Sequence, residues 1–270
     1  GRYITIPVYP LSFDEYQRHH RAQGTTDSTD QLFSKYMMFG GMPGLFATGQ
    51  PDQDKATEIL TSIYESIVMK DVAGRYGIRD IATLEKLSRY LFSTSGNLFS
   101  VNKVANTLTS AGANASYATV DNQISALERS FIVYSAQQER MRGKELLRPQ
   151  RKFYPVDNGF RNLATGFNGS DRGAQLEGIV FMELQRRGYD VTIGSLPDGE
   201  IDFIAKRGNN KQYIQVTLNM TEEQTREREL DPLRRLGDAF PRTVLTLDWH
   251  SEGMTDEGIH ITNVMDWLCS

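Results

Sequence analysis

The 270-residue sequence has a single cysteine, Cys269, which excludes both a disulfide framework and a cysteine-ligated zinc site. No stretch approaches the ~18 consecutive apolar residues that a membrane-spanning helix requires, so no membrane partner is expected. The start of the chain also lacks the design of a signal peptide. Together these absences predict a cytoplasmic location.

Three common catalytic motifs are absent as well. A phosphate loop, G-x-x-x-x-G-K-[ST], is not present, because the Gly143-Lys144 pair lacks the first glycine and the final Ser or Thr. The four histidines show no metal-ligand spacing, and no G-x-S-x-G nucleophile motif occurs. No ATPase activity and no bound cofactor are therefore expected of this chain itself, and no metal site is predicted.

The length suggests roughly two domains, with one or three as alternatives. Residues 1–77 are predicted to form a mostly helical segment, with helices over 13–23, 29–39 and 52–72. One strand is expected before them, over 3–9 (YITIPVY), and it has no visible partner in this segment. A leading strand without a partner predicts that the chain is cut from a longer protein.

Residues 78–155 are predicted to form a winged helix-turn-helix domain. Helices are expected over 80–94, 100–111 and 116–130, and a β-hairpin over 131–156 follows them. The hairpin carries a basic run, RMRGKELLRPQRK (140–152), with six basic residues and one acid, although the formal net charge of the chain is −4. A solvated hairpin with no ligand is the alternative interpretation of this run.

Residues 156–270 are predicted to form an α/β sandwich. Two helices (157–166 and 172–188) precede three strands (189–196, 200–206 and 211–218), and a charged helix, two further strands and a last helix follow. The predicted fold class is thus α/β and multi-domain: a helical segment, a winged helix, and a sandwich like that of restriction endonucleases.

The hairpin GEIDFIAKRGNNKQYIQVT (199–217) resembles the metal-binding hairpin of a nuclease. Such a site uses an Asp on one strand and D/E-x-K on the next, because carboxylates bind Mg²⁺ and the lysine stabilises developing charge. Asp202 fits the first position, and Glu177 on the preceding helix could add an acid. The alternatives, which the local sequence alone favours, are a surface strand acid for Asp202 and a salt-bridged helix acid for Glu177. The D/E-x-K positions hold Gln215 and Thr217, which predicts a degenerate, inactive site. A basic residue from elsewhere would be the alternative, with four candidates: Lys206, Lys211, Arg186 and Arg187.

Seven segments resemble the C-terminal part of a prokaryotic AAA-superfamily ATPase family. They are KDVAGRYGIRD (70–80), GNLFSVNKVANTL (96–108), GKELL (143–147), KFYPVDNGFRN (152–162), GAQLEGIVFMELQRRGYDV (173–191), EIDFIAK (200–206) and YIQVTLNM (213–220). The resemblance implies a winged helix followed by a PD-(D/E)xK nuclease-like domain of unknown function. It also implies an upstream P-loop ATPase domain as partner, with ATP and Mg as cofactors of the full-length parent. It places Arg2 near a nucleotide as a sensing arginine, and a plain surface arginine is the alternative favoured for this chain.

The expected function is DNA binding by the winged helix, as part of an ATPase and without nuclease activity. The third helix would present four residues to a groove: Tyr117, Thr119, Asn122 and Gln123. The wing would contact phosphates through five: Arg142, Lys144, Arg148, Arg151 and Lys152. The alternatives are a metal-dependent nuclease with a divergent site, and a module for protein interaction or homo-oligomerisation.

Overall fold

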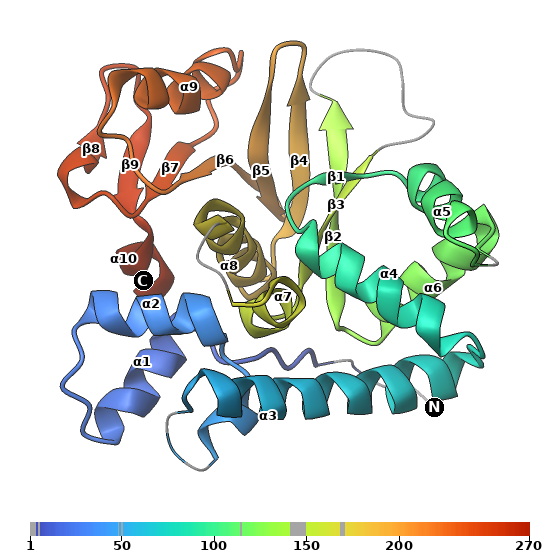
Figure 1. The fold of residues 1–270 in the computed structure, drawn as a ribbon. Helices are drawn as coiled ribbons and strands as arrows, with labels where there is room; N and C mark the ends of the chain where they lie inside the picture. The colour runs from blue at the N-terminus through green and yellow to red at the C-terminus, as the bar shows by residue number, and fades with distance from the viewer. Residues whose placement is uncertain are drawn as a thin grey trace.

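A computed structural model describes residues 4, 6–47, 49, 51–113, 115–140, 150–167 and 171–270. These residues form ten α-helices and a mixed sheet of nine strands (Figure 1). The α/β class is therefore confirmed. Within the same ranges, no helix is both long and apolar enough to cross a membrane.

The first part of the chain is helical, as expected. It contains α1 (Phe13–Ala22), α2 (Thr29–Phe39), the 3-10 turn η1 (Pro43–Phe46) and α3 (Gln53–Ser66), which continues into the π-helical segment η2 (Ile67–Gly74). A capping box starts α1: Ser12 Oγ accepts from the Glu15 N–H at 3.1 Å, and the Glu15 carboxylate accepts from the Ser12 N–H at 2.8 Å. The strand expected over 3–9 is not found, since residues 4 and 6–9 belong to no strand.

Three helices and three strands follow. They are α4 (Ile81–Ser93), β1 (Leu98–Phe99), α5 (Val101–Ser110), α6 (Tyr117–Arg129), β2 (Val133–Arg140) and β3 (Arg151–Pro155). The strands β2 and β3 pair antiparallel, and β1 adds to the other edge of β3, also antiparallel. The helices and the hairpin lie where the sequence predicts them, whereas the two-residue strand β1 was not predicted.

The last part of the chain contains most of the sheet. Its elements are α7 (Asn158–Thr165), α8 (Arg172–Arg186), β4 (Asp190–Leu196), β5 (Gly199–Arg207), β6 (Asn210–Thr217), α9 (Glu223–Arg234), β7 (Arg242–Thr246), η4 (Trp249–Ser251), β8 (Gly253–Met254), β9 (His260–Asn263) and α10 (Val264–Cys269). Strands β4, β5 and β6 form an antiparallel meander, and β7 runs parallel to β6. The overall strand order is β1-β3-β2-β4-β5-β6-β7-β9-β8.

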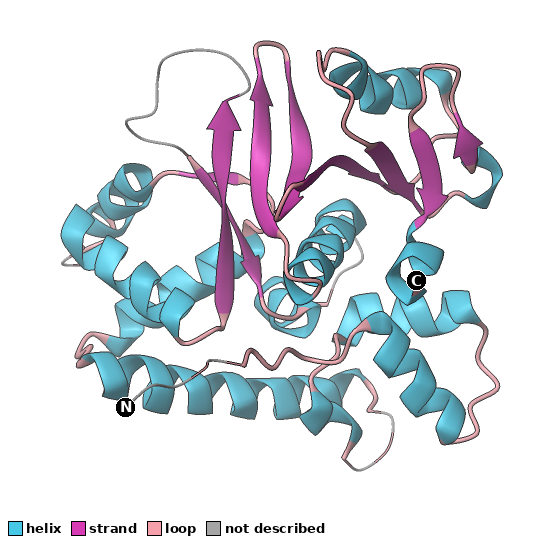
Figure 2. Ribbon diagram, turned by 180° about the vertical axis from the view of Figure 1, so that it is seen from behind, coloured by secondary structure: helices cyan, strands magenta, loops and turns pink. Residues whose placement is uncertain are grey.

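One unpredicted pairing makes the sheet continuous. Strand β2 pairs in parallel with β4 through Gln138–Ile193, Glu139–Gly194 and Arg140–Ser195. The hairpin of the middle segment and the meander of the last segment therefore belong to one surface (Figure 2). Helix α8 packs against β3 to β6 on one face, while α9 packs against β5 to β7. The face under α8 carries the candidate site.

Candidate functional site

A β-bulge in β5 places Asp202 and Phe203 next to each other on the face toward α8. Thr192 of β4 pairs with Ile204 and Gly194 pairs with Ile201, so Ile193 alone faces both Asp202 and Phe203. Two residues opposite one is the signature of a bulge, which redirects side chains locally. Ile201 and Ile204 lie in the core under α9, whereas Phe203 lies in the core under α8. The bulge lets Asp202 and Phe203 face α8 together.

Asp202 and Gln215 hold this bulge to strand β6 by reciprocal bonds. The Val216 N–H donates to Asp202 Oδ2 at 2.8 Å, and the Asp202 N–H donates to Gln215 Oε1 at 3.3 Å. Gln215 is buried, and its carbonyl oxygen is committed to the backbone of β5. Thr217, also buried, donates its hydroxyl to Asn219 O at 3.2 Å. Both residues that replace D/E-x-K therefore have structural bonds.

A lysine from β3 occupies the acidic side of the site. Lys152 is only 5% exposed, and its ammonium lies 3.3 Å from Glu177 Oε1 of α8 and contacts Glu200 Oε1 of β5. Glu200 precedes Asp202 by two residues, so the alternation of β5 places both on one face. The expectation that Lys152 contacts phosphate does not fit this position, because its charge is enclosed by protein carboxylates.

Tyr154 forms the floor beside Lys152. It lies two residues further along β3 on the same face, and its hydroxyl donates to Glu177 Oε1 at 2.7 Å. Its ring stacks on Phe181 of α8, with centroids 4.2 Å apart. On the opposite side, a Cβ built on Gly96 would lie 3.1 Å from Glu177 Oε2. The Glu177 carboxylate is therefore bounded by a phenol, an ammonium and the backbone before β1.

The site shifts the pKa values of Asp202, Glu177 and Lys152 upward. Burial raises the pKa of Asp202 well above its ordinary value, and the negative charge of Glu177 raises it further. Burial also raises the pKa of Glu177, and the nearby Lys152 charge offsets this only in part. For Lys152, burial lowers the pKa, but the charges of Glu177, Glu200 and Asp202 outweigh this and raise it. The lysine stays protonated while Asp202 resists ionisation.

This arrangement does not fit a catalytic metal ion. Gln215 contributes no charge, and Lys152 already supplies a cation to Glu177. Among the described residues, no group of three or more His, Cys, Asp or Glu is placed to hold a metal.

The other basic residues considered for this site pair elsewhere. Lys206 Nζ lies 2.6 Å from Glu139, and Lys211 Nζ lies 3.5 Å from Asp238. Arg186 and Arg187 both bind Glu183, at 3.1 and 2.8 Å. The basic residue that the site does contain is Lys152, which the sequence had indicated only as part of the wing. The sequence did contain a sign that Lys152 is buried, because it begins KFYPV (152–156), a strand that is otherwise apolar.

The residues predicted to face a nucleic-acid groove divide into exposed and buried ones. Tyr117 is 52% exposed at the start of α6, Asn122 is exposed, and Thr119 is half-buried. Gln123 is buried, so it does not fit a role in direct contact with a groove. Gln123 lies three residues after Val120 and four before Leu127, so it shares their buried face of α6.

Arg151 lies beside α6 rather than on an open wing. Its guanidinium is 3.6 Å from Asp121 and 3.4 Å from Glu128, and it covers the ring of Phe153 at 5.0 Å. Arg151 thereby shares its single positive charge between the two acidic residues of α6. Arg142, Lys144 and Arg148, together with Arg2, lie outside the described residues.

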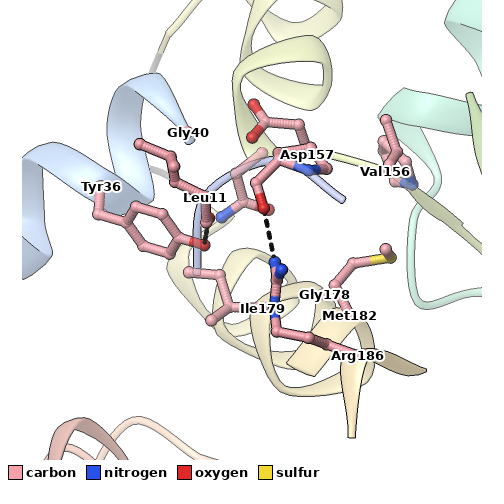
Figure 3. A pocket seen from close by; sticks show the side chains of 12 residues that line it. Leu11, Tyr36, Gly40, Val156, Asp157, Gly178, Ile179, Met182 and Arg186 are labelled. Carbon is pink, nitrogen blue, oxygen red and sulfur yellow. Dashed lines mark hydrogen bonds between the residues drawn. The ribbon is translucent and has the colours of Figure 1, made fainter. Parts of the chain in front are cut away.

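A second buried acid, Asp157, lies in a small cavity between α2, α7 and α8 (Figure 3). Its two carboxylate oxygens accept from the N–H groups of Gly41 and Gly159, each at 2.7 Å. Burial raises its pKa to about 6, although both backbone bonds oppose this. Arg186, across the cavity, donates to Pro10 O at 2.7 Å. Asp157 caps α7 and holds the end of α2, which is a structural role.

Residues 30–171, more than half of the chain, match the family described as "Domain of unknown function (DUF8612)". The chain belongs to this family. The DUF8612 match includes Lys152 and Tyr154 but ends before Glu177, Glu200 and Asp202. The acidic side of the site therefore lies outside the range that defines the family.

Two longer proteins are similar to this DUF8612 chain. An "Uncharacterized protein" of Haemophilus influenzae is 36% identical over 268 residues, which cover 99% of this chain and 65% of the relative. "Uncharacterized protein MJ1544" of Methanocaldococcus jannaschii is 27% identical over 241 residues, which cover 85% of this chain and 53% of that relative. The chain thus spans less than two thirds of the length of each. No solved structure matches it.

Proposed function

We propose that this chain is the C-terminal binding region of a AAA-superfamily ATPase, which binds DNA through a winged helix and carries a nuclease-like domain without catalytic activity. One observation carries the catalytic part of this proposal. Lys152, buried against Glu177 and Glu200, supplies from the protein itself the positive charge that a nuclease would take from Mg²⁺.

The order of elements supports a nuclease-like interpretation of the last segment. Helix α8 precedes the antiparallel strands β4, β5 and β6, and α9 connects to β7, which is parallel to β6. Of the two acids predicted from the sequence, Glu177 of α8 raises the pKa of Asp202 through its negative charge. The shape of such a site is retained, while its charges are arranged for an internal ion pair.

The middle segment supports the winged-helix interpretation. Its order α4, β1, α5, α6, β2, β3, with β1 and β2 on either side of β3, is the order of elements in a winged helix. The exposed face of α6 offers Tyr117 and Asn122, while Arg151 offsets one of the two negative charges of Asp121 and Glu128. This ion pairing weakens the repulsion between α6 and a phosphate backbone.

The ATPase part of the proposal rests on the resemblance of the sequence. The relatives extend beyond the matched region, which leaves room for an ATPase domain with its bound ATP and Mg. The role of Arg2 near a nucleotide belongs to the same proposal.

The catalytic part is tested with supercoiled plasmid and either Mg²⁺ or Mn²⁺. We expect no cleavage by the unaltered chain, and none by Asp202→Ala. Cleavage that the unaltered chain performs and Asp202→Ala abolishes would overturn the proposal. Equal cleavage by both proteins identifies a contaminating nuclease. Both proteins are then purified further until Asp202→Ala no longer cleaves the plasmid.

The DNA-binding part is tested by fluorescence anisotropy with a labelled duplex. We expect binding at low salt that weakens steeply as salt rises, because counterions are released from the phosphates. Tyr117→Ala with Asn122→Ala should weaken it about tenfold or more. Phe240→Ala, which removes a ring 41% exposed before β7, is the matched control and should bind normally. Absence of binding at low salt would exclude this function.

A further inference from the structure

A cavity at the end of α1 lies apart from both the candidate site and the exposed face of α6. The last turn of α1 and the chain just after it line one side, and the end of η1 with the chain after it lines the other. The cavity has a volume of about 430 Å³, which is within the range of small-molecule sites. Figure 1 shows α1 on the opposite side of the molecule from α6.

Two of the rings that line this cavity are not enclosed by the core. Phe46 and His19 are each half-buried, and their centroids lie 5.7 Å apart with an angle of 49° between the planes. A partly accessible aromatic ring binds the flat ring of a base by stacking. The cavity therefore offers a place for one flat ring.

His20 brings a polar atom without a partner to the same cavity. This residue is 5% exposed and packs against Tyr16 and Phe46, with ring centroids 4.3 and 5.4 Å away. Within the described residues, its Nε2 has no hydrogen-bond partner. Buried nitrogen atoms in native proteins nearly always have one, so this atom is suited to a bond with a ligand.

The lining of the cavity offers no charged anchor for an ion. None of the described residues that line it is Asp, Glu, Lys or Arg. Burial lowers the pKa of His20, and the nearby His19 and Lys35 lower it further, so its imidazole is neutral near pH 7. A neutral imidazole has one nitrogen that donates and one that accepts. The ligand that fits this lining is polar and uncharged.

Gln23 adds an amide at the open side. Its backbone N–H caps α1 by donating to carbonyl oxygens of the last turn, while the residue is exposed and lines the cavity. An amide pairs with one edge of adenine through two hydrogen bonds, because N6 of the base donates and N7 accepts. On the same edge guanine presents two acceptors instead.

We propose that this cavity binds an adenine base, carried by an uncharged nucleoside or by an unpaired strand. The base lies against Phe46 and His19, and the amide of Gln23 pairs with N6 and N7. The Nε2 of His20 donates to one of the two remaining ring acceptors, N1 or N3.

The experiment titrates the full 270-residue chain with adenosine, followed by ligand-observed NMR. We expect a Kd on the order of 1 mM or tighter for a ligand of this size. Inosine, whose O6 accepts where N6 of adenosine donates, should bind about tenfold more weakly. Methyl β-ribofuranoside, which lacks the base, should not bind. Absence of adenosine binding, or equal binding of inosine, overturns the proposal.

A variant of Gln23 tests the reading of the base edge. Gln23→Leu removes the amide at similar size, so it should bind adenosine about tenfold more weakly and lose the preference for adenosine over inosine. Gln53→Leu, at an exposed position of α3 that does not line the cavity, is the matched control and should keep both. An unchanged preference in a folded Gln23→Leu variant would contradict the proposal.

A variant of His20 tests the buried nitrogen. His20→Phe keeps a ring against Tyr16 and Phe46 but removes both nitrogens, so it should weaken adenosine and inosine by the same factor of about ten. Thermal unfolding of the same sample verifies its fold, and the exposed Gln23 position decides if this variant does not fold. Normal adenosine binding by folded His20→Phe would overturn the role of Nε2.

Nuclear Overhauser effects locate the bound base. The H8 and H2 protons of adenosine should show them to the ring protons of Phe46, and effects to other rings alone would place the ligand elsewhere and overturn the proposal. A short oligonucleotide of deoxyadenosine presents the same base in a strand. If it binds more tightly than adenosine and Gln23→Leu weakens it, the base comes from an unpaired strand, whereas tighter binding of adenosine identifies a free nucleoside.

Discussion

The ammonium of Lys152 lies 3.3 Å from the carboxylate of Glu177, and this pair joins β3 of the middle segment to α8 of the last segment. The lysine side chain is 6% exposed and that of Glu177 is 17% exposed. The pair is therefore largely removed from solvent. Its strength depends on both partners being present, because an unpaired charge at this depth is costly.

Lys152→Met should lower the free energy of unfolding at pH 7 by about 3 kcal/mol, since it leaves Glu177 and Glu200 without their cation. Urea denaturation measures this change. The matched control is Lys206→Met, which removes the half-exposed pair with Glu139. It should cost about 1 kcal/mol or less. An equal loss of unfolding free energy in both variants would show that the buried pair stabilises the fold no more than the half-exposed pair does.

The position of Gly40 gives a second prediction. Gly40 ends α2 with φ 79° and ψ −165°, and a Cβ there would lie 1.8 Å from Asp157 Oδ1. Gly40→Ala should therefore displace the buried carboxylate and lower stability by well over the ~1 kcal/mol of a backbone effect alone.

The control is Gly166→Ala at the end of α7. Gly166 also has a positive φ of 83°, but nothing lies within 4 Å of the added Cβ. It should lose only about 1 kcal/mol of stability, again measured by urea denaturation. A Gly40→Ala variant as stable as Gly166→Ala would contradict the close contact with Asp157.

The helices and most strands could be predicted because their signals are local. Ser12 and Glu15 form a capping box within four residues, and Ser100 caps α5 by accepting from the Lys103 N–H at 3.4 Å. The alternation in 200–206 also indicated a strand with Asp202 in it. Such patterns depend on neighbours in the sequence, so they require no knowledge of the tertiary fold.

The features that define the site depend on distant residues. Lys152 meets partners 25 and 48 positions away, and the pairing of β2 with β4 joins residues about as far apart. The bulge at Asp202 forms where one residue of β4, Ile193, lies opposite two residues of β5, Asp202 and Phe203. Charge type alone assigned Lys152 to phosphate contact, since a basic run on a hairpin looks the same whether its last lysine is exposed or buried.

The pH dependence of stability should report on Asp157. Because burial raises its pKa to about 6 in the folded chain, the folded state binds this proton more tightly than the unfolded state does. Its contribution to stability is complete below about pH 4 and is lost as pH rises to about 6. The loss amounts to about 3 kcal/mol.

Asp157→Asn isolates this contribution, because asparagine does not titrate. The difference in unfolding free energy between the two proteins, measured by urea at pH 4 and pH 7, should change by about 3 kcal/mol in favour of the variant as pH rises. Glu177 and Asp202 also have raised pKa values, but they are common to both proteins and cancel in the difference. A difference that is constant with pH would contradict the raised pKa.

Restoring the acid of the D/E-x-K pattern should destabilise the chain rather than activate it. Gln215→Glu keeps an oxygen for the Asp202 N–H but adds a negative charge beside a carboxyl group that already resists ionisation. We expect a loss of about 1–3 kcal/mol at pH 7 and a smaller loss at pH 5, where protonation relieves the repulsion. Gln212→Glu, on the same strand but half-buried, is the control and should cost less.

Adding Asp202→Asn to Gln215→Glu should recover most of the loss, because it removes the second charge. If Mg²⁺ stabilised Gln215→Glu while Lys152 is still present, then Lys152 would not occupy the cation position, and the proposed lack of nuclease activity would lose its main support.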